Sequence, residues 1–585
     1  MEQTGSQATV PPGPGSNPFA SQSRRPLGQI LTAAATPVHY ASLIVALPLL
    51  VHLDRNQWFT ADVFLFFQHM QPGQPLDLFA SHNGHWTTIP FLITLPLFKV
   101  FGLRSITPYN ALNVVLHLLV THLLWRWMRR LGADPWMATA LAGVFLFVGG
   151  GSEALASWFQ MTTALPIALG LAGAMLVDHA GAGIRRDLLY WPIGVAAVMC
   201  SVAGVAMVFL AVLVALLRRG WRAAIRVASL PAVVYLLWLA LYGRGNFIQQ
   251  PGQTWQLALV PQDIWTGITY DVDATTGLIG GGAVILIALG CWLFVRRRLA
   301  RTEAAFAYAA LAAGLAFFLA LGLDRTTVGP QGFTYGRYGY VFIAMLIPAI
   351  ARALIPVSRR IAGRVLVVAL SAVLVLNGVG QLETLLHTIE PANVADRDQI
   401  LAAAHLLATG APLAVNDTAL PEPIQDGDLP LRLLRSLLQT GALPMDSPLS
   451  TTDYLDAALR IQLSVTAQPL PGLGAGVPAL EPDSSQPVHP ASGANAGCIT
   501  VASPTTTSQL QFVFSEPGYL EIVADGGGQV GVQLAWAQTP QTLTAGTATF
   551  PLSAGQPAYL NVTATGVAPL LTLPAGVDLV CGASS

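Results

Sequence analysis

The run AAFAYAALAAGLAFFLALGL at residues 304–323 holds twenty residues without one charged side chain. A helix of that length crosses the roughly 30 Å hydrocarbon core of a bilayer. A second run, TGLIGGGAVILIALGCWLFV at residues 276–295, has the same character. The chain of 585 residues is 53% hydrophobic and only 10% charged, which is too little charge to cover a soluble globule of this size. These features predict a polytopic α-helical membrane protein.

Apolar segments of spanning length recur through the first two thirds of the chain, and we expect about eleven spans. The pair between residues 188 and 217 is short, so it is either a hairpin or one broken element. The expected spans lie near residues 38–53, 107–127, 135–150, 155–178, 188–201, 203–217, 224–243, 276–295, 304–323, 338–355 and 364–381.

The arginines predict how these spans are oriented. The short connectors RWMRR, GIRRD, RRGWRAAIR, RRRLAR and SRRIAGR all fall on one side, together with the N-terminal SRR. That side is cytoplasmic by the positive-inside rule. With the N-terminus inside, the long connectors 54–106 and 244–275, and everything after residue 382, face outward. No GxxxxGK[ST] motif occurs in the short connectors, so we expect chemistry on the outer face without ATP.

The first residues and the choice of basic residue indicate the compartment. Residues 1–36 begin with a polar stretch rich in Pro, Gly and Ser and lack the apolar core of a signal peptide, which predicts a disordered cytoplasmic tail. Lys99 is the only lysine among 29 basic residues, a bias typical of a high-GC bacterium. The net charge of −1 implies no attraction to nucleic acid. We therefore expect a multi-pass protein of a bacterial plasma membrane.

The tail is expected to be extracytoplasmic and to divide in two. Residues 383–480 carry helical periodicity interrupted by prolines, which predicts a mixed, mainly helical segment. From about residue 490 the pattern changes to short alternating runs such as QLQFVFS and YLEIVAD, which predicts a small β-sandwich over residues 490–585. Cys498 opens this module and Cys581 closes it, so the two are candidates for a disulfide bond.

The long connector 54–106, called the first loop below, gathers polar residues between two apolar segments. The segments WFTADVFLFFQHM and HWTTIPFLITLPLFKVFG are too short or too polar to span and are expected to lie at the membrane interface. Between them lie acidic side chains and the sequence HNGHW at residues 82–86. The pattern predicts a polar site held against the outer membrane surface.

At this point the sequence resembles a family, the membrane glycosyltransferases of the GT-C fold. A long first outer loop with acidic residues after the first span is typical of these enzymes. The resemblance continues in Asn113 and His117 of the next span, in GGGSEALASWFQ at 149–160, and in FTYGRYGYVFIAMLIPAIA at 333–351. It covers roughly residues 38–382 and rests on the order and predicted outer placement of these motifs.

The resemblance implies transfer of a sugar from a polyprenyl-phosphate-linked donor to an envelope glycan or glycolipid acceptor, with membrane lipid as surroundings. An attacking hydroxyl must lose a proton, so an inverting enzyme needs a carboxylate base. The departing phosphate needs cationic or hydrogen-bonding stabilisation. We expect Asp62, on the apolar-flanked interfacial segment, to be the base, with Asp54 directly after the first span as the alternative. Both also have a plain interpretation as solvated or end-of-span charges.

HNGHW is expected to contact the substrates. His82, Asn83 and His85 could bind acceptor hydroxyls or the donor phosphate, and Trp86 offers a sugar-stacking face. Relatives often carry Glu where this chain has Gly84, which shifts the acidic role to Asp62. The two histidines could bind a divalent cation such as Mg²⁺ or Mn²⁺, but spacing fixes no third ligand, so the metal and any cofactor stay open.

Further residues are expected at the same site. Glu153 and Gln160 flank the outer end of a helical hairpin and could contact the acceptor or order the first loop. Arg337, beside Tyr338 at the outer mouth of a span, is suited to a lipid phosphate as a bidentate donor. Capping or interfacial anchoring would also explain these residues.

Two other functions compete with this interpretation. A transporter or flippase for an envelope precursor would place ionisable residues within spans and show repeated halves, and the sequence has few such charges. A membrane-anchored carbohydrate-binding protein would need fewer spans. The sequence leaves the sugar, the acceptor and the oligomeric state open.

Overall fold

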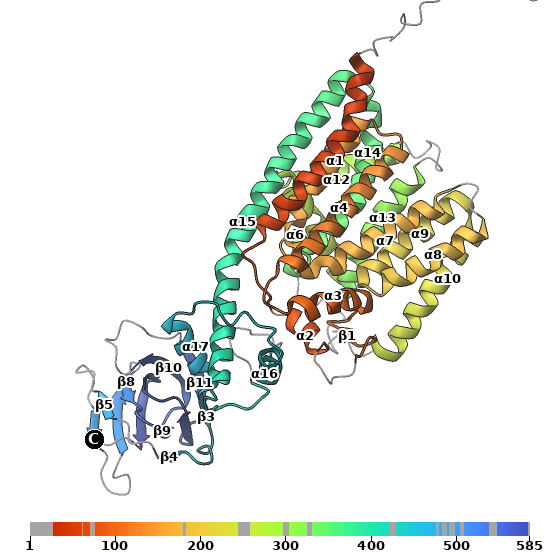
Figure 1. Cartoon of the computed structure of the whole chain (residues 1–585). Helices are drawn as coiled ribbons and strands as arrows, with labels where there is room; N and C mark the ends of the chain where they lie inside the picture. The colour runs from red at the N-terminus through yellow and green to blue at the C-terminus, as the bar shows by residue number, and fades with distance from the viewer. Residues whose placement is uncertain are drawn as a thin grey trace, which may run out of the picture.

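The computed structural model (Figure 1) shows a helical bundle followed by a β-sheet module. It describes residues 27–60, 62–70, 76–179, 183–243, 258–295, 304–324, 330–419, 429–475, 479–481, 488–490, 498–503, 508–536 and 547–582. The helices have these bounds: α1 Leu27–Leu53, α2 Asp62–Gln68, α3 Thr88–Phe101, α4 Thr107–Arg130, α5 Pro135–Leu146, α6 Ser152–Leu155, α7 Met161–Val177, α8 Ile184–Val198, α9 Val202–Arg219, α10 Trp221–Trp238, α11 Val260–Thr276, α12 Gly281–Val295, α13 Ala305–Asp324, α14 Gly336–Ser358, α15 Ile361–Ala408, α16 Leu431–Gln439 and α17 Thr451–Ile461.

The described residues contain eight helices long and apolar enough to span a membrane, or up to ten if each bent helix pair is one span. The polytopic helical fold is therefore confirmed, although the count is lower than the eleven expected. The difference is α8, which has only 15 residues and carries charges in its first turn. It packs beside α9, as expected for one arm of a short hairpin.

The connector expected at residues 244–275 is not simply a loop. Its second half forms α11, which packs into the bundle through the buried side chains of Ile268 and Val272. The chain then bends by 105° into α12. Gly277 and Gly280 take positive φ values of 72° and 76° at the bend, where only glycine is unstrained. The carboxylate of Asp273 accepts a hydrogen bond from the Gly280 amide at 2.7 Å.

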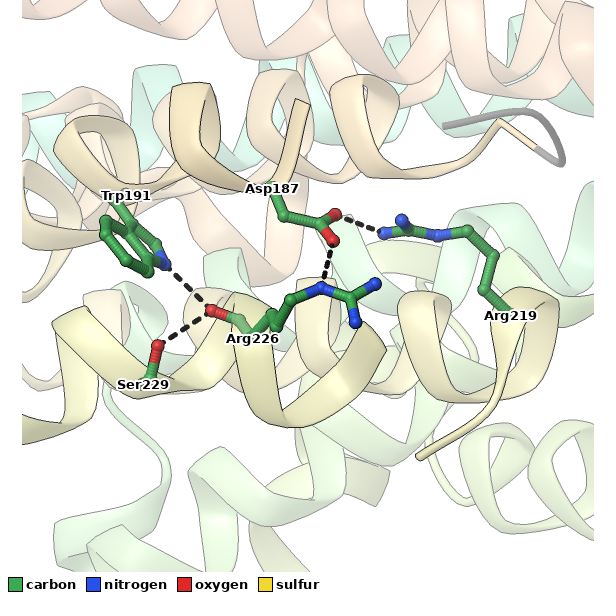
Figure 2. A network of polar contacts seen from close by, with 5 residues as sticks. All are labelled: Asp187, Trp191, Arg219, Arg226 and Ser229. Carbon is green, nitrogen blue, oxygen red and sulfur yellow. Dashed lines mark hydrogen bonds and ion pairs between the residues drawn. The ribbon is translucent and has the colours of Figure 1, made fainter. Parts of the chain in front are cut away.

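Arginines of the described short connectors pair with acidic side chains of neighbouring segments. Arg364, at the start of α15, pairs with Asp134 before α5 at 3.0 Å. Figure 2 shows a second contact of this kind, in which Asp187 of α8 receives Arg219 of α9 at 2.7 Å and Arg226 of α10 at 3.0 Å. The N-terminus of α1 lies at the end where α15 begins (Figure 1). This common placement is what the charge pattern predicts; the side of the membrane stays a prediction.

The 48-residue helix α15 connects the two parts of the molecule (Figure 1). It was expected to end near residue 381, but it continues through Pro391 to Ala408. Its second half contacts the first loop: the Asn56 amide donates to Glu390 at 2.7 Å, and Asn393 donates to Gln57. The first loop therefore lies at the same end of the bundle as the tail.

The tail ends in two sheets, whose strand pairs are antiparallel except for the parallel pair of β4 and β9. One has five strands in the order β11-β10-β13-β8-β5, and the other has seven, with β3-β12-β9-β14-β7-β6 in line and β4 beside β9. Their inner faces share one core, to which β9 contributes alternate residues such as Leu520 and Ile522. The strands are β3 Leu463–Thr466, β4 Gly474–Ala475, β5 Ala479–Glu481, β6 Val488–Pro490, β7 Cys498–Ser503, β8 Ser508–Val513, β9 Gly518–Ala524, β10 Gly528–Trp536, β11 Ala548–Leu552, β12 Pro557–Val562, β13 Val567–Leu573 and β14 Gly576–Cys581.

Cys498 and Cys581 are paired across β7 and β14 and joined by a disulfide, the pair that the sequence predicts. The expected boundaries differ in detail. Strands β3, β4 and β5 come from the segment 383–480, so the sheets begin before residue 490. Residues 1–26 of the expected tail 1–36 lie outside the described residues, whereas residues 27–36 belong to α1.

Candidate active site

A cavity of about 600 Å³ lies where the first loop meets the bundle and the middle of α15. Four separate parts of the chain line it. They are residues 57–63 of the first loop, residues 149–160, residues 334–337 before and at the start of α14, and the α15 face that carries Gln381 and Asn393. Tyr270 and Ala274 of α11 add to the wall. Three segments that are distant in sequence and carry predicted site residues therefore share one cavity.

Aromatic rings form one side of this cavity. Trp58 is fixed by a hydrogen bond from its indole N–H to the Leu103 carbonyl at 3.2 Å. Trp158 is 2% exposed and packs against Tyr109, with ring centroids 5.1 Å apart. Both tryptophans line the cavity. Rigid aromatic rings beside polar groups are typical of small-molecule sites.

Arg337 and Glu153 face each other at the cavity wall. Their charged atoms are 3.6 Å apart, with the two side chains 30% and 31% exposed. Glu153 also accepts a hydrogen bond from the Arg337 backbone amide at 3.3 Å. The guanidinium carbon lies 4.8 Å from the Tyr335 ring centroid and 5.4 Å from that of Tyr338. The two aromatic rings thus orient the Arg337 guanidinium, which borders the cavity and is partly exposed to solvent.

Gln160 lies in the same cavity and is 7% exposed. Its side-chain carbonyl accepts a hydrogen bond from Thr163 at 3.2 Å, one turn further along the chain. The structure therefore places Glu153, Gln160 and Arg337 at one cavity. Tyr338 is not among the lining residues, but its ring contacts the Arg337 guanidinium. The segment between Glu153 and Gln160 is fixed by Asn113, whose amide donates to the carbonyls of Ala154 and Ser157.

Asp62 is the first residue of α2, between Thr60 and Val63, which both line the cavity. The placement of its side chain lies outside the described residues. Helix α2 buries Phe64 and Phe67 in the aromatic cluster around Trp58 and Tyr109. The helix start is therefore held at the cavity edge by packing.

Asp54 follows α1 and is 2% exposed. Neither carboxylate oxygen has a hydrogen-bond partner among the described residues. Its backbone carbonyl accepts from Asn110 at 3.3 Å and from the Gln57 amide at 3.3 Å. Burial raises the pKa of Asp54 well above its ordinary range, because desolvation disfavours the carboxylate. Asp54 does not line the cavity, but Gln57 and Trp58, three and four residues later, do.

HNGHW forms a two-residue β-hairpin away from the cavity. Its strands β1 (Ser81–His82) and β2 (His85–Trp86) pair His82 with His85. Asn83 and Gly84 have φ values of 47° and 81°, as a type I′ turn requires. The turn geometry therefore accounts for the Asn-Gly pair without a ligand.

The flanking residues of the hairpin pack inward. Trp86 is 3% exposed and stacks on Trp238 of α10 at 5.3 Å and 3°. Its indole N–H donates to Thr88 at 2.6 Å. His82 is in contact with Phe66 and Phe159 and borders a separate pocket of about 20 Å³. The single pocket expected to contain both HNGHW and Arg337 is thus absent from the described part of the chain.

The described residues contain no group of three His, Cys, Asp or Glu side chains placed to hold a metal ion. His69 and Asp77 border the same small pocket as His82, but among the described residues they do not form such a group with it.

Sequence reasoning missed several residues that line the cavity or lie directly behind its lining. Asp271 of α11 is 0% exposed, and its two carboxylate oxygens have no hydrogen-bond partner among the described residues. It lies against the backbone of Gly150 and Gly339, since a Cβ on Gly339 would be 2.5 Å from its Oδ1 and 2.1 Å from the Gly150 carbonyl. The signal was an aspartate in TGITYDVDATTG, a stretch interpreted as loop. Gln57 and Asn393 gave no signal because their pairing depends on tertiary structure.

A groove of about 550 Å³ runs along α15 beside the cavity. It shares Ser152, Gln381 and Leu385 with the cavity and continues to Asn377 and Leu376. Leu376 is 72% exposed and belongs to the apolar half of α15. The groove, lined mainly by polar side chains such as Asn377 and Thr384, therefore connects the cavity with the end of the apolar half of α15.

No protein-family model matches the chain, and no curated protein matches it. Among solved structures, the chain is similar to the crystal structure of ArnT from Cupriavidus metallidurans bound to undecaprenyl phosphate. The identity is 13% and the TM-score is 0.42, over 74% of this chain and 88% of that one.

Proposed function

We propose that this protein is an integral membrane glycosyltransferase of GT-C type. It transfers a sugar from a polyprenyl-phosphate-linked donor to an envelope glycan or glycolipid on the outer face of a bacterial plasma membrane. One observation carries this proposal: the first loop, GGGSEALASWFQ and FTYGRYGY, three of the motifs behind the resemblance, line one cavity. A groove leads from that cavity along α15 to Leu376, where the apolar half of the helix ends.

Arg337 is assigned to the donor phosphate. A guanidinium offers the planar, bidentate geometry that phosphate prefers. Its partner Glu153 is 3.6 Å away and partly exposed, so a phosphate can replace this contact at little cost. The groove along α15 gives the polyprenyl chain a path from the bilayer to the cavity.

The acceptor hydroxyl enters from the aqueous side and needs a carboxylate base. We assign this role to Asp62, because its neighbours Thr60 and Val63 line the cavity. Asp54 is the alternative, a buried acid whose carboxylate has no hydrogen-bond partner among the described residues and which lies three residues before Gln57 of the cavity lining. Gln160 and the aromatic side chains Trp58 and Trp158 orient the sugars. The hairpin residues His82, Asn83 and His85 are proposed to order the first loop and to bind substrate groups at the edge of that loop.

A transporter or flippase for an envelope precursor is the alternative function. Asp271 favours it, because buried ionisable groups in membrane-embedded helices are a mark of transport pathways. The two functions differ in product: a transferase makes a new glycosidic bond, whereas a flippase moves its lipid substrate unchanged.

The test is incubation of the purified protein with a panel of polyprenyl-phospho-sugars, followed by detection of sugar transfer and of donor hydrolysis. Asp62→Asn keeps the side-chain shape, and turnover should fall about a hundredfold because the general base is lost. Asp77→Asn is the matched control, since this exposed aspartate of the same loop does not line the cavity.

The outcomes separate the assignments. If Asp62→Asn is active and Asp54→Asn is not, the base is Asp54 and the transferase function stands. If both variants keep full turnover, neither aspartate is the base. If the wild type makes no new glycosidic bond and only moves the labelled lipid across the membrane, the transferase proposal is wrong.

A further inference from the structure

A second large pocket, about 440 Å³ in volume, lies between α3 and the turn after α16. Its apolar wall is formed by Met70, Leu76, Leu95 and Phe98. Thr440, Gly441 and Ala442 of the tail close the opposite side. The pocket is separate from the cavity described above, because the described residues that line the two have no member in common.

Two cations lie at the rim of this pocket. Lys99 is in the last turn of α3, and Arg104 follows the helix. The Arg104 guanidinium donates from Nε to the Phe101 carbonyl at 3.1 Å and from Nη2 to the Val100 carbonyl at 3.0 Å. Neither cation forms an ion pair with an acidic side chain among the described residues. Unneutralised cations above an apolar wall match an amphiphile with an anionic head.

The position of α3 indicates that the amphiphile comes from the membrane. This 14-residue apolar helix is too short to span. Its outer side exposes Leu92 by 45% and Val100 by 62%, which is expected of a helix at the membrane interface. Cations at the end of such a helix lie at headgroup depth, where anionic lipids concentrate.

The junction that holds the pocket is rigid. The Leu103 amide donates to the Ala442 carbonyl at 2.7 Å. Gly102 has a φ of 56°, and a Cβ there would be 2.7 Å from the same carbonyl oxygen. Tyr109 donates to the Gly102 carbonyl at 2.8 Å. The Leu103 carbonyl also accepts a hydrogen bond from the indole N–H of Trp58, which lines the cavity. The pocket, the tail and the cavity wall are therefore all bonded to the same backbone segment.

We propose that this pocket binds the phosphate headgroup of an anionic membrane phospholipid, with Lys99 and Arg104 on the phosphate and the acyl chains against Leu95 and Phe98. The bound lipid fastens the tail to the first loop at a fixed membrane depth. This inference does not depend on the transferase reaction.

The single lysine makes the proposal directly testable. The full chain carrying Arg55→Lys is placed in nanodiscs of phosphatidylcholine alone or with phosphatidylglycerol, and its amines are labelled with an acetylating ester. Position 55 is an exposed cation of the same loop outside the pocket, where the Arg55 guanidinium donates to the His52 carbonyl at 2.6 Å. Its introduced lysine reports the general effect of the charged surface. Peptide mass spectrometry measures acetylation at both positions.

Phosphatidylglycerol should slow labelling of Lys99 about tenfold relative to position 55, the factor that one charge-assisted hydrogen bond supports. Arg104→Gln should remove most of that protection, with a thermal melt as the check on folding. If phosphatidylglycerol slows labelling equally at Lys99 and at position 55, the proposal is wrong. Protection by inorganic phosphate in pure phosphatidylcholine would also overturn it, because the ligand would then be a soluble anion.

Discussion

Two ion pairs at opposite ends of the bundle use similar residues in different ways. Asp187 receives Arg219 and Arg226 at 2.7 and 3.0 Å, and its side chain is 1% exposed (Figure 2). Glu153 and Arg337 are 3.6 Å apart, and each is about a third exposed. The first is a closed contact that joins three helices. The second is a loose contact at the wall of a cavity.

The difference separates charges that hold the fold from charges that can serve a ligand. Two close arginines compensate the desolvation of Asp187, and Trp191 fixes the Arg226 backbone from the other side at 2.8 Å. A group bound so completely has nothing left to offer a substrate. The Arg337 side chain is 30% exposed, and its contact with Glu153 is long and solvent-exposed, so this contact is weak.

The largest expected effect follows from breaking the closed pair. Asp187→Asn should lower the free energy of unfolding by about 3 kcal/mol, since it removes the buried carboxylate that pairs with Arg219, which is 7% exposed, and with the more exposed Arg226. Unfolding in mixed micelles with increasing SDS measures the change. Asp417→Asn is the control, because its pair with Arg435 is exposed and contributes about 1 kcal/mol at most. Equal losses in the two variants would contradict the assignment.

The loose pair should respond in the opposite way. Arg337→Ala should weaken binding of a polyprenyl phosphate by about 2 kcal/mol, or about thirtyfold, because a charge-assisted phosphate contact is lost. Its stability should stay near that of the wild type. Titration with the lipid phosphate measures the affinity, and Arg337→Lys should retain part of it. Unchanged affinity with a large loss of stability would make Arg337 a structural residue like Arg219.

Asp54 extends the comparison to a buried acid whose carboxylate has no partner in the part of the chain that the structure describes. Burial raises the pKa of Asp54, so the folded state favours the protonated acid. The associated stability is complete below the ordinary pKa and is lost as the pH rises through the raised value. The loss is about 1.4 kcal/mol for each pH unit in that window. Asp54→Asn should flatten this part of the stability profile, and thermal melts from pH 4 to pH 8 would show it. An unchanged profile would mean that another group titrates.

The smallest effect should come from Glu153→Gln. The exposed pair contributes at most about 1 kcal/mol to folding, and the amide can still accept from the Arg337 backbone. Removing the competing carboxylate should tighten lipid-phosphate binding slightly, by about threefold or less. Calorimetry on the wild type and the variant resolves a change of that size. Weaker binding would show that Glu153 positions the guanidinium instead of competing for it.

Local patterns predicted the elements well and their meeting points poorly. Run length predicted the helices, and alternation predicted the sheets, because both depend on neighbouring residues. The Asn83–Gly84 pair was interpreted as part of a binding site, although Asn-Gly is the usual two-residue hairpin turn. The long helix α15 was missed because Pro391 suggested a break, yet packing on the first loop carries the helix past it.

The candidate site shows the same limit. Glu153, Gln160 and Arg337 were chosen separately, and only tertiary packing could show that they share a cavity. Trp86 was expected to present its face to a sugar, but Trp238, 152 positions later in the chain, covers it. Asp271 escaped notice because its helix was taken for a loop. Contacts between distant segments cannot be inferred from one sequence alone.

The residues of the cavity wall are synthesised at widely separated times. Gln57 and Asn393, which both line the cavity and are hydrogen-bonded to each other, are 336 positions apart. At about 5–20 residues per second, a ribosome delivers the second roughly 20–70 s after the first. The first loop must therefore wait at the membrane surface while the bundle is inserted. The cavity closes only when α15 arrives, so a prematurely terminated chain lacks one wall of it.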